Sequence, residues 1–581
     1  MTSLVVALCA PVSAQPTAPV ERQYPAAGQG FAVVALHRVG DRPDTLGEGG
    51  VSSEHLVAFF DWLAGNGWHA ISLVDVERAR RGIKPLPERA ILITVDDGDI
   101  SLYTRVYPLA LAYRTPIVAA VVGQWLDVRP GGSVNYGGVP VPRSQFIDWN
   151  QAREMQASGL VEFASHSYDL HKEVLANPQG NVLPAATTRL YSKEHGYEDG
   201  AAYRTRLRTD LQHARDQIKR ELGRAPRAIV WPFGRYGATA VETARELGFE
   251  YALTLDPQPG DAMHPMALGR YLPLGDPDLG TWVANIRFAD PWPSSRRIVS
   301  LDPAILADAD PAVTNERLGR VIERLLALGA TDVLIDAAVP GADGDLVATW
   351  FPNSVLPMRQ DLLPRLAAQL RGRANVKVGV RLPHRQALKS LGSAQRVVQL
   401  FADLAAHVPV AAVMVEDAAQ LSRPGVLATD TPWSVREHRA RLDLAGWPPE
   451  DALAMLAFRA VEAERPGVEL LWLAALGRTP SSPSTLADVT LIPAELGDRD
   501  ALKQFEWSRD FRAPEYRRMG VWWRGTTPPA GIDLATATRD FQAHGGTVLG
   551  WQPDGSLIDA PAGELVSPAV SALPFPRETR P

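Results

Sequence analysis

The sequence of 581 residues contains a single cysteine, Cys9. Because a disulfide needs two thiols, and a thiolate metal site usually needs several, neither can form in the body of the chain. Any metal ion must then be bound by histidine, aspartate or glutamate side chains. Histidine is also scarce, with 12 residues in the whole chain. Histidines that converge on one point of the fold are therefore an informative signal.

The sequence also lacks a strongly basic segment and, beyond its N-terminus, a long apolar run. The formal net charge is -7, and charged residues of one sign are not concentrated in one stretch. This balance argues against nucleic acid as a partner and is compatible with a neutral or cationic one. No later stretch is long and apolar enough to predict a transmembrane helix. We expect an ordinary globular protein of two or three domains that is monomeric and binds no nucleic acid.

The N-terminus resembles the end of a secretory signal peptide. A short apolar core is followed by Val12-Ser13-Ala14, a small-residue cleavage pattern. We expect residues 1–14 to be removed on export to the periplasm. A basic segment before the apolar core is missing, so the natural start is expected upstream of Met1. Lipid anchoring through Cys9 to the outer membrane stays open but is not favoured, because Leu8 is bulky for a lipoprotein site.

The first half alternates strand-like and helix-like segments, the pattern of an α/β fold with parallel strands. Apolar runs predict strands at 31–36, 69–73, 90–95, 116–122, 160–165, 228–231 and 251–254. Helical spacing predicts helices at 51–65, with Ser52 or Ser53 as the N-cap, at 102–113 and at 202–222. We assign residues 15–289 to this first domain.

A segment rich in proline and aspartate, 290–297, predicts a linker, and a second alternating series follows it. Its strands are expected at 332–335, 376–380, 410–415, 470–473, 489–492, 520–523 and 547–551. Seven or eight strands in this span suit a (β/α)8 barrel over 298–570, followed by a tail at 571–581.

An acidic pair, Asp96-Asp97, follows the continuously apolar strand 90–95 and precedes Gly98. Moving a carboxylate out of water costs roughly several kcal/mol unless a cation or hydrogen-bond donors compensate for the lost hydration. The carboxyl ends of parallel strands are also where α/β folds bind ligands. The pair therefore predicts a functional site, although an Asp-Asp-Gly surface turn is an equally simple interpretation of these residues alone.

Histidines stand at or just past the ends of two other predicted strands. His37 follows the first strand, and His166 and His171 belong to the segment after 160–165. Two histidines and one carboxylate leave open coordination positions, which is the pattern of a catalytic metal site. The set Asp97, His166 and His171 predicts one divalent cation (Zn, Co or Ni), which leaves Asp96 free to act as a general base. Taken singly, each histidine is more simply a surface or hydrogen-bonded histidine.

These residues also carry a resemblance to a known family. The segments 95–98 (Val-Asp-Asp-Gly) and 166–171 (His-Ser-Tyr-Asp-Leu-His) resemble the first two motifs of the polysaccharide deacetylases, carbohydrate esterase family 4. Segments 131–138, 146–155 and 231–236 resemble, more closely, the branch of poly-β-1,6-N-acetyl-D-glucosamine N-deacetylases typified by PgaB. The resemblance implies a distorted, circularly permuted (β/α) barrel of the deacetylase type, followed by a glycoside-hydrolase-like (β/α)8 barrel.

The resemblance also implies roles for individual residues. It gives Asp96 as the base, Asp97, His166 and His171 as metal ligands, and His37 as the general acid. The backbone N–H of Phe233 becomes a candidate donor to the oxyanion. Where the wider family has an arginine, this chain has Trp231, and Arg235 is a candidate to replace it. Trp231, Arg235 and Tyr168 are candidate substrate-binding residues, with core packing as the alternative for Trp231 and for Phe233.

The second half resembles the branch through segment 350–362. Family members use this barrel to bind the partly deacetylated polymer, and some cleave it. The candidate residues are Glu416 and Asp417, at a strand end where the family has a histidine and an aspartate pair. Since Val415 replaces the histidine and Glu416 the first aspartate, we expect glycan binding with weak or lost cleavage. Several tryptophans of this half could stack on sugars, but core packing is the simpler expectation: Trp350, Trp472, Trp522, Trp523 and Trp551.

The leading interpretation is an exported, metal-dependent N-deacetylase of poly-β-1,6-N-acetyl-D-glucosamine, active during biofilm export, with an outer-membrane export porin as a further candidate partner. One alternative is deacetylation of a chitooligosaccharide or peptidoglycan. A second is a catalytically silent glycan-binding export factor. A third is a glycosidase whose first domain only binds.

Overall fold

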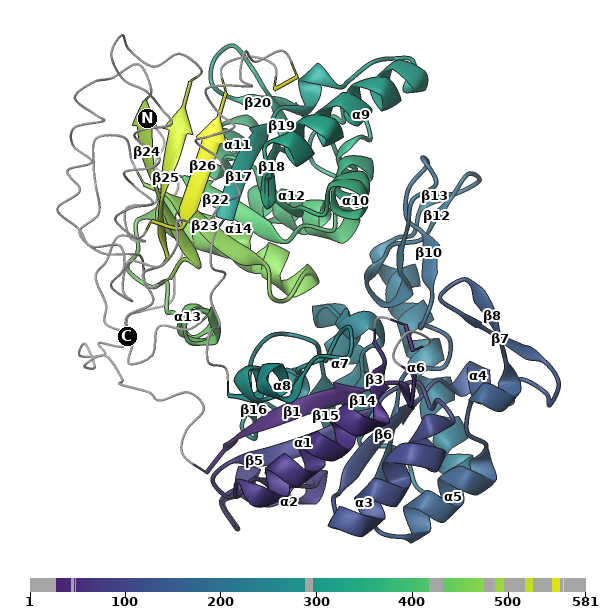
Figure 1. Cartoon of the computed structure of the whole chain (residues 1–581). Helices are drawn as coiled ribbons and strands as arrows, with labels where there is room; N and C mark the ends of the chain where they lie inside the picture. Colours follow the sequence, from purple (N-terminus) through teal and green to yellow (C-terminus); the bar gives the residue numbers. More distant parts are fainter. Residues whose placement is uncertain are drawn as a thin grey trace.

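The structure, a computed structural model, describes residues 28–42, 46–47, 49–287, 296–416, 432–474, 484, 486–495, 518–525, 546–553 and 557–558. Within these residues the chain forms two α/β units that follow each other in sequence (Figure 1). The first contains an open, mostly parallel sheet, and the second a closed barrel of eight strands. The predicted α/β class, with a deacetylase-type sheet followed by a (β/α)8 barrel, is therefore confirmed.

The sheet of the first unit has the strand order β15-β14-β9-β6-β5-β1-β16, with β4 paired to β5. The hydrogen-bonded path does not close, and only β16 runs antiparallel to its neighbour. The strands are β1 (Gly30–Leu36), β4 (His69–Ala70), β5 (Ala90–Val95), β6 (Ile117–Val121), β9 (Val161–Ser165), β14 (Ala228–Val230), β15 (Tyr251–Leu253) and β16 (Gly260–Asp261). Adjacent parallel strands end at one edge, so residues that follow β1, β5, β9 and β14 become neighbours.

The predicted elements of the first unit match the structure closely because their local signals are strong. All six residues of β5 are buried, as expected for a strand covered on both faces. The N-cap of α1 is Ser52, whose hydroxyl accepts the His55 N–H. The helices are α1 (Ser53–Gly65), α2 (Leu73–Arg80), α3 (Tyr107–Tyr113), α4 (Gly123–Asp127), α5 (Trp149–Ala157), α6 (Gly200–Leu222), α7 (Ala238–Glu246) and α8 (Leu279–Ile286). A π-helical turn at Leu102–Val106 precedes α3, where one continuous helix was expected.

Short hairpins extend from the first unit. The pair β7 (Ser133–Tyr136) and β8 (Val139–Pro142) forms one of them. The pairs β10 (Glu173–Leu175) with β11 (Val182–Pro184), and β12 (Tyr191–Ser192) with β13 (Gly196–Tyr197), form two others between β9 and α6. A further two-stranded pair joins β2 (Val39–Gly40) to β3 (Val51–Ser52). The sequence pattern predicted none of these, since each is too short to show a period.

The barrel of the second unit contains only parallel pairs and closes between β26 and β17. Its strands are β17 (Arg296–Leu301), β18 (Asp332–Asp336), β21 (Lys377–Arg381), β22 (Ala412–Glu416), β23 (Glu469–Leu473), β24 (Val489–Glu495), β25 (Met519–Arg524) and β26 (Val548–Gln552). The strand β17 begins at Arg296, so the last two residues of the predicted linker belong to the barrel. The rest of that linker, the signal peptide with Cys9, and the tail lie outside the described residues.

Helices cover the outside of the barrel (Figure 1). They are α9 (Pro311–Ala327), α10 (Leu363–Ala374), α11 (His384–Leu391), α12 (Ala394–His407), α13 (Pro432–Ala440) and α14 (Pro449–Glu464), and the pair β19 (Ala338–Pro340) and β20 (Leu346–Thr349) lies after β18. The five tryptophans considered for sugar stacking are all buried, so core packing is confirmed for Trp350, Trp472, Trp522, Trp523 and Trp551.

The two units touch at the β12–β13 hairpin and at the loop between β10 and β11. The Tyr197 hydroxyl donates to Asp361 Oδ2 at 2.5 Å, and its ring lies 4.7 Å from that of His407. Gln179 Nε2 donates to the Asp361 carbonyl at 2.7 Å. Figure 1 shows this hairpin extending from the first unit toward the barrel. Among the described residues, no helix is both long and apolar enough to cross a membrane.

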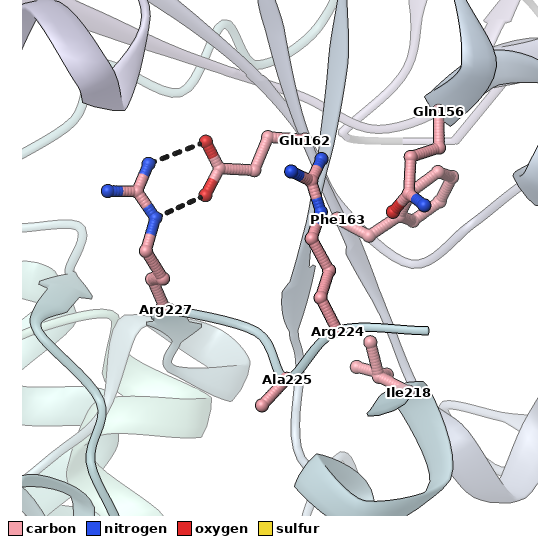
Figure 2. A pocket seen from close by; sticks show the side chains of 7 residues that line it. All are labelled: Gln156, Glu162, Phe163, Ile218, Arg224, Ala225 and Arg227. Carbon is pink, nitrogen blue, oxygen red and sulfur yellow. Dashed lines mark hydrogen bonds and ion pairs between the residues drawn. The ribbon is translucent and has the colours of Figure 1, made fainter. Parts of the chain in front are cut away.

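A small hollow of about 210 Å³ lies at the amino ends of β9 and β14 (Figure 2). Charged side chains of its wall already bond to protein groups: the Arg227 guanidinium donates to both oxygens of Glu162 and to Glu77 Oε2. The hollow lies at the amino edge of the sheet, whereas the polar residues singled out in the sequence follow the strands at the carboxyl edge. We therefore interpret it as a structural feature.

Candidate active site

The carboxyl edge of the first sheet gathers side chains that follow three strands. His37 follows β1, the acidic pair follows β5, and His166 follows β9. Since β9, β6, β5 and β1 are consecutive neighbours in the sheet, these side chains converge although they are far apart in sequence. Asp96, Asp97 and His166 are each about 1% exposed, which makes this one of the most polar parts of the domain interior.

Asp97, His166 and His171 form one compact cluster, in which a ligand atom from each lies within 4.8 Å of the others. Asp97 Oδ1 is 3.4 Å from His166 Nε2 and 3.3 Å from His171 Nε2. This oxygen is buried and accepts no hydrogen bond within the described part of the chain. A buried carboxylate oxygen facing two imidazole nitrogens fits a divalent cation bound by His₂Asp, so the donor set agrees with the metal expected from the sequence.

The orientation of His166 is fixed by its other nitrogen. Nδ1 lies 2.7 Å from the Val230 carbonyl on β14. Because a carbonyl can only accept, Nδ1 carries the hydrogen, and in the neutral ring Nε2 carries the lone pair that a cation would need. Burial by itself lowers the pKa of His166, but the neighbouring Asp97 and Asp96 raise it by more, so the net direction is upward.

His171 is enclosed by aromatic rings. Phe233 and Trp125 lie 4.5 Å and 4.9 Å from its ring centroid, and Tyr136 lies 6.3 Å away. This burial lowers the pKa of His171 to about 4, so the imidazole is neutral near pH 7 and can bind a metal. Burial alone would raise the pKa of Asp97, but His171 and His166 outweigh that cost and hold it well below its usual range.

Asp96 is held by an arginine that the sequence analysis missed. Arg270 Nη1 donates to both Asp96 oxygens at 2.9 Å and to the Thr94 hydroxyl at 3.0 Å, and Arg270 Nε donates to the Thr254 carbonyl at 3.0 Å. His37 Nε2 lies 3.9 Å from Asp96 Oδ2, and its side chain is 18% exposed. Asp96 thus lies between a buried cation and a partly exposed imidazole.

The loop 166–171 is fixed from two helices. From α6, the Asp210 carboxylate accepts the backbone N–H groups of Tyr168 and Asp169 at 2.9 and 2.7 Å. From α4, the N–H groups of Gly123 and Gln124 donate to the carbonyls of Ser167 and Tyr168. Burial raises the pKa of Asp210 to about 6. These bonds bring His171 back to His166, which helical geometry at a spacing of five would not do.

Three residues at this edge adopt left-handed backbone conformations that cost free energy for residues other than glycine. They are Asp97 at φ 71°, Ser167 at φ 69° and Phe233 at φ 57°. Gly98 follows at φ 71°, where an added Cβ would lie 3.3 Å from Val121 Cγ1. Such strain persists where the surroundings over-determine the conformation, which is common at functional sites.

Two candidates from the sequence, Trp231 and Tyr168, lie away from the metal cluster. Trp231 is fully buried in a core cluster with Ile229 and Tyr203, so it packs the core and cannot contact a substrate. The Tyr168 ring stacks on His213 at 3.7 Å, and its hydroxyl donates to Asp127 at 3.2 Å. Neither side chain points into the metal cluster.

Arg235 does not take the place of the family's arginine. It is exposed, and its charge acts on Asp256 and on Arg371 of the barrel. Arg270 occupies the position beside Asp96 instead. The Phe233 ring is 39% exposed beside His171, so this side chain borders the site and is not part of the core.

Two functional positions were missed in the sequence. Arg270 lies in an otherwise apolar run, 266–271, and a lone arginine there was the available signal. Tyr136 was noted only as part of a glycine-rich segment, yet its hydroxyl donates to Asp97 Oδ2 at 2.7 Å. Burial and the Asp97 charge raise the pKa of Tyr136, which keeps the hydroxyl protonated.

At the carboxyl end of the barrel, Arg381 lies between several polar groups. It donates through Nε and Nη2 to both Asp336 oxygens, at 2.6 and 2.9 Å, and through Nη1 to Gln552 at 3.2 Å. Glu416 ends β22 with Oε1 at 3.7 Å from Arg381 Nη1. Asp417, the other candidate of this barrel, lies outside the described residues.

Comparisons with known proteins agree with these two units. Residues 83–252 match the family model described as polysaccharide deacetylase, and residues 299–385 match one described as hypothetical glycosyl hydrolase family 13. Two curated relatives are named poly-beta-1,6-N-acetyl-D-glucosamine N-deacetylase. One, from Escherichia coli (strain K12), is 33% identical over 356 residues, which cover 61% of this chain and 53% of that protein.

The other, from Staphylococcus aureus (strain MSSA476), is 20% identical over 187 residues, covering 32% of this chain and 54% of that protein. The chain thus spans about half the length of the curated relatives it matches. Among solved structures, the BpsB deacetylase domain from Bordetella bronchiseptica is 37% identical, covers 43% of this chain and 97% of that one, and has a TM-score of 0.39. The chain is therefore similar to the polysaccharide deacetylases over its first unit and to a glycosyl hydrolase family over the first part of its barrel.

Proposed function

We propose that this protein is a metal-dependent hydrolase that removes N-acetyl groups from poly-β-1,6-N-acetyl-D-glucosamine. The observation that carries the proposal is the Asp97, His166 and His171 cluster beside an arginine-bound carboxylate, Asp96. The names of the matched relatives supply the substrate class. The aromatic side chains at the edge of the cluster suit a sugar, because aromatic faces pack against the apolar faces of sugar rings.

Asp97, His166 and His171 would hold the divalent cation, which supplies Lewis acidity when bound. Zn, Co and Ni all accept this donor set. Asp96 accepts the proton of the attacking water, and Arg270 fixes the carboxylate for that step. The water oxygen bonds to the acetyl carbon as the carbonyl π bond opens and its oxygen takes the negative charge. The carbon–nitrogen bond then breaks as that oxygen re-forms the double bond and the nitrogen takes a proton, which releases acetate and a free amine.

The leaving nitrogen needs a proton, and His37 is placed to supply it. Its ring lies across Asp96 from Arg270 and is partly exposed, so it can face both the site and solvent. The Phe233 N–H, in a strained turn beside His171, is the candidate donor to the oxygen that gains negative charge. Each group thus has one role in amide hydrolysis: base, acid or oxyanion donor.

We propose for the barrel a glycan-binding role with weak or lost cleavage. The Arg381 guanidinium pairs with Asp336 and lies beside Glu416, so the carboxylates of this end are already engaged with a cation. Glycosidases need two carboxyl groups of separate ionisation state. The wider proposal includes export to the periplasm, a role in biofilm polymer export and an outer-membrane porin as partner.

The test is acetate release from synthetic β-1,6-linked N-acetylglucosamine oligomers, with β-1,4-linked oligomers as the comparison. We expect release from the β-1,6 oligomers, its loss after chelation, and its recovery on adding Zn²⁺, Co²⁺ or Ni²⁺. Asp97→Ala should abolish both metal binding and release. Asp169→Asn is the matched control, because that carboxylate bonds Lys172 at the surface.

Any of four results would contradict the proposal. Release that is unchanged by chelation, or retained by Asp97→Ala, would exclude a metal-dependent deacetylase. Preferred release from β-1,4 oligomers would indicate a chitooligosaccharide or peptidoglycan deacetylase. No release at all, combined with glycan binding, would favour a catalytically silent export factor.

A further inference from the structure

We propose that Tyr136 is a positioning residue that makes Asp97 a ligand through one oxygen only. The inference rests on the proposed metal site and deepens it. The Tyr136 hydroxyl donates to Asp97 Oδ2 at 2.7 Å, whereas Oδ1 faces the two imidazoles. The two oxygens of one carboxylate therefore have different partners, and the phenol occupies the oxygen that points away from the histidines.

The hydrogen bond is largely shielded from water because Asp97 is buried and Tyr136 is half-buried. Asp97 is 1% exposed, and the Tyr136 side chain packs between Trp125 and Phe146 at centroid distances of 5.3 and 6.2 Å. In such surroundings a carboxylate oxygen without its donor is unfavourable, so binding to another cation or donor would lower its free energy. The cation bound at Oδ1 is the nearest candidate, so loss of the phenol favours binding of the metal by both oxygens.

Tyr136 comes from β7, a strand outside the central sheet, so its position depends on how the β7–β8 hairpin is attached. The foot of this hairpin is held by Arg143, whose N–H donates to the Gly132 carbonyl at 2.9 Å. The Arg143 guanidinium donates to the carbonyls of Phe146 and Ile147. The hairpin is thus fixed to the loop that carries Phe146, and it delivers one hydroxyl to the metal ligand.

A single ligand oxygen has a consequence for chemistry. His₂Asp with one carboxylate oxygen gives three protein ligands and leaves positions for water and for the amide carbonyl. A second carboxylate oxygen would fill one of these positions. Tyr136 would therefore keep a coordination position open for substrate, in addition to fixing the orientation of Asp97.

The test compares Tyr136→Phe with the wild-type protein after loading with Co²⁺. We expect the Kd for Co²⁺ to rise by about tenfold, because loss of a hydrogen bond to a metal ligand usually weakens metal binding on this scale. We also expect the visible spectrum at saturating Co²⁺ to shift and to lose intensity as the coordination number rises. Tyr197→Phe is the matched control, because it also loses a tyrosine-to-carboxylate hydrogen bond but lies at the interface with the barrel.

An unchanged Kd and spectrum in Tyr136→Phe would overturn the inference, even if the melting temperature fell. If the wild-type protein itself binds no Co²⁺, the proposed function fails as well, which distinguishes the two failures. A crystal structure of the wild-type protein with Co²⁺ tests the same point without a variant. Binding of the metal through both Asp97 oxygens in that structure would also overturn the inference.

Discussion

Arg270 and Asp96 form a buried ion pair across 174 residues of sequence, with one guanidinium nitrogen 2.9 Å from both carboxylate oxygens. The Arg270 side chain is 1% exposed. This pairing compensates for the desolvation of a carboxylate in the interior of the sheet domain, where isolated burial would be costly. It also fixes the direction in which Asp96 presents its lone pairs.

We predict that Arg270→Lys lowers acetate release by about 100-fold, because lysine loses the Nε bond to the Thr254 carbonyl that fixes the cation, which leaves the Asp96 base misaligned. The Kd for the metal should stay within about twofold of wild type, since the metal ligands are separate from this pair. Release would be followed in metal-saturated protein, with Arg153→Lys at the surface as the control. Equal activity of the two variants would contradict the role given to Arg270.

Asp210 gives a second prediction, because it anchors the loop between the two histidine ligands without touching either ligand. Asp210→Ala removes the acceptor of two backbone N–H groups. The loop should then hold His171 less firmly, and we expect the metal to bind about tenfold more weakly. Calorimetric titration with Zn²⁺ measures this change. Asp216→Ala, an exposed position on the same helix, should leave the Kd unchanged.

The metal cluster could be predicted from sequence, whereas the groups that orient it could not. Asp97 and His166 stand at the ends of strongly apolar strands, with His171 on the loop after the second, and strand ends of a parallel sheet have a known common edge. Arg270 and Tyr136 reach the same point from a loop and a hairpin that have no period. Their placement depends on tertiary packing, which a pattern along the chain does not encode.

The same limit applies to two candidates whose side chains lie away from the Asp97, His166 and His171 cluster. Trp231 and Arg235 were selected because they flank Pro232-Phe233-Gly234, a turn at the right strand end. Side-chain direction within a turn depends on its backbone angles, and here Phe233 at φ 57° faces His171 while Trp231 enters the core. The strand end was predictable, but the direction of each side chain was not.

A third prediction concerns the barrel. Arg296 is buried at the amino end of β17, where it pairs with Asp332 and lies 2.9 Å from Glu469 Oε2. Arg296→Met leaves the buried Asp332 carboxylate without its cation, although the half-buried Glu469 keeps Lys377, and this should destabilise the barrel by about 3–5 kcal/mol. Urea unfolding followed by tryptophan fluorescence measures the loss. Arg320→Met, an exposed position on α9, should change stability by less than about 0.5 kcal/mol.

The last prediction follows from His407, whose ring lies against Tyr197 where the two units meet. Burial is the main reason that the pKa of His407 falls to about 4, and the nearby Arg189 and Arg465 add to it. A histidine that is neutral when folded binds its proton more readily in the unfolded chain, where its pKa is about 6.5. Its contribution to stability is therefore complete above pH 6.5 and is lost as the pH falls toward 4.

Between pH 7.5 and pH 5, this one group should lower the free energy of unfolding by about 2 kcal/mol. His407→Gln, which stays neutral throughout, should remove that part of the pH dependence while the rest of the curve is retained. Urea unfolding of both proteins at the two pH values gives the difference directly. Because the His407 ring contacts Tyr197, the contact between the two units should weaken in the wild-type protein as the pH falls from 7.5 to 5. Proteolysis between the units should then be faster at pH 5 than at pH 7.5. Parallel stability curves for the two proteins would show that His407 is not the group responsible.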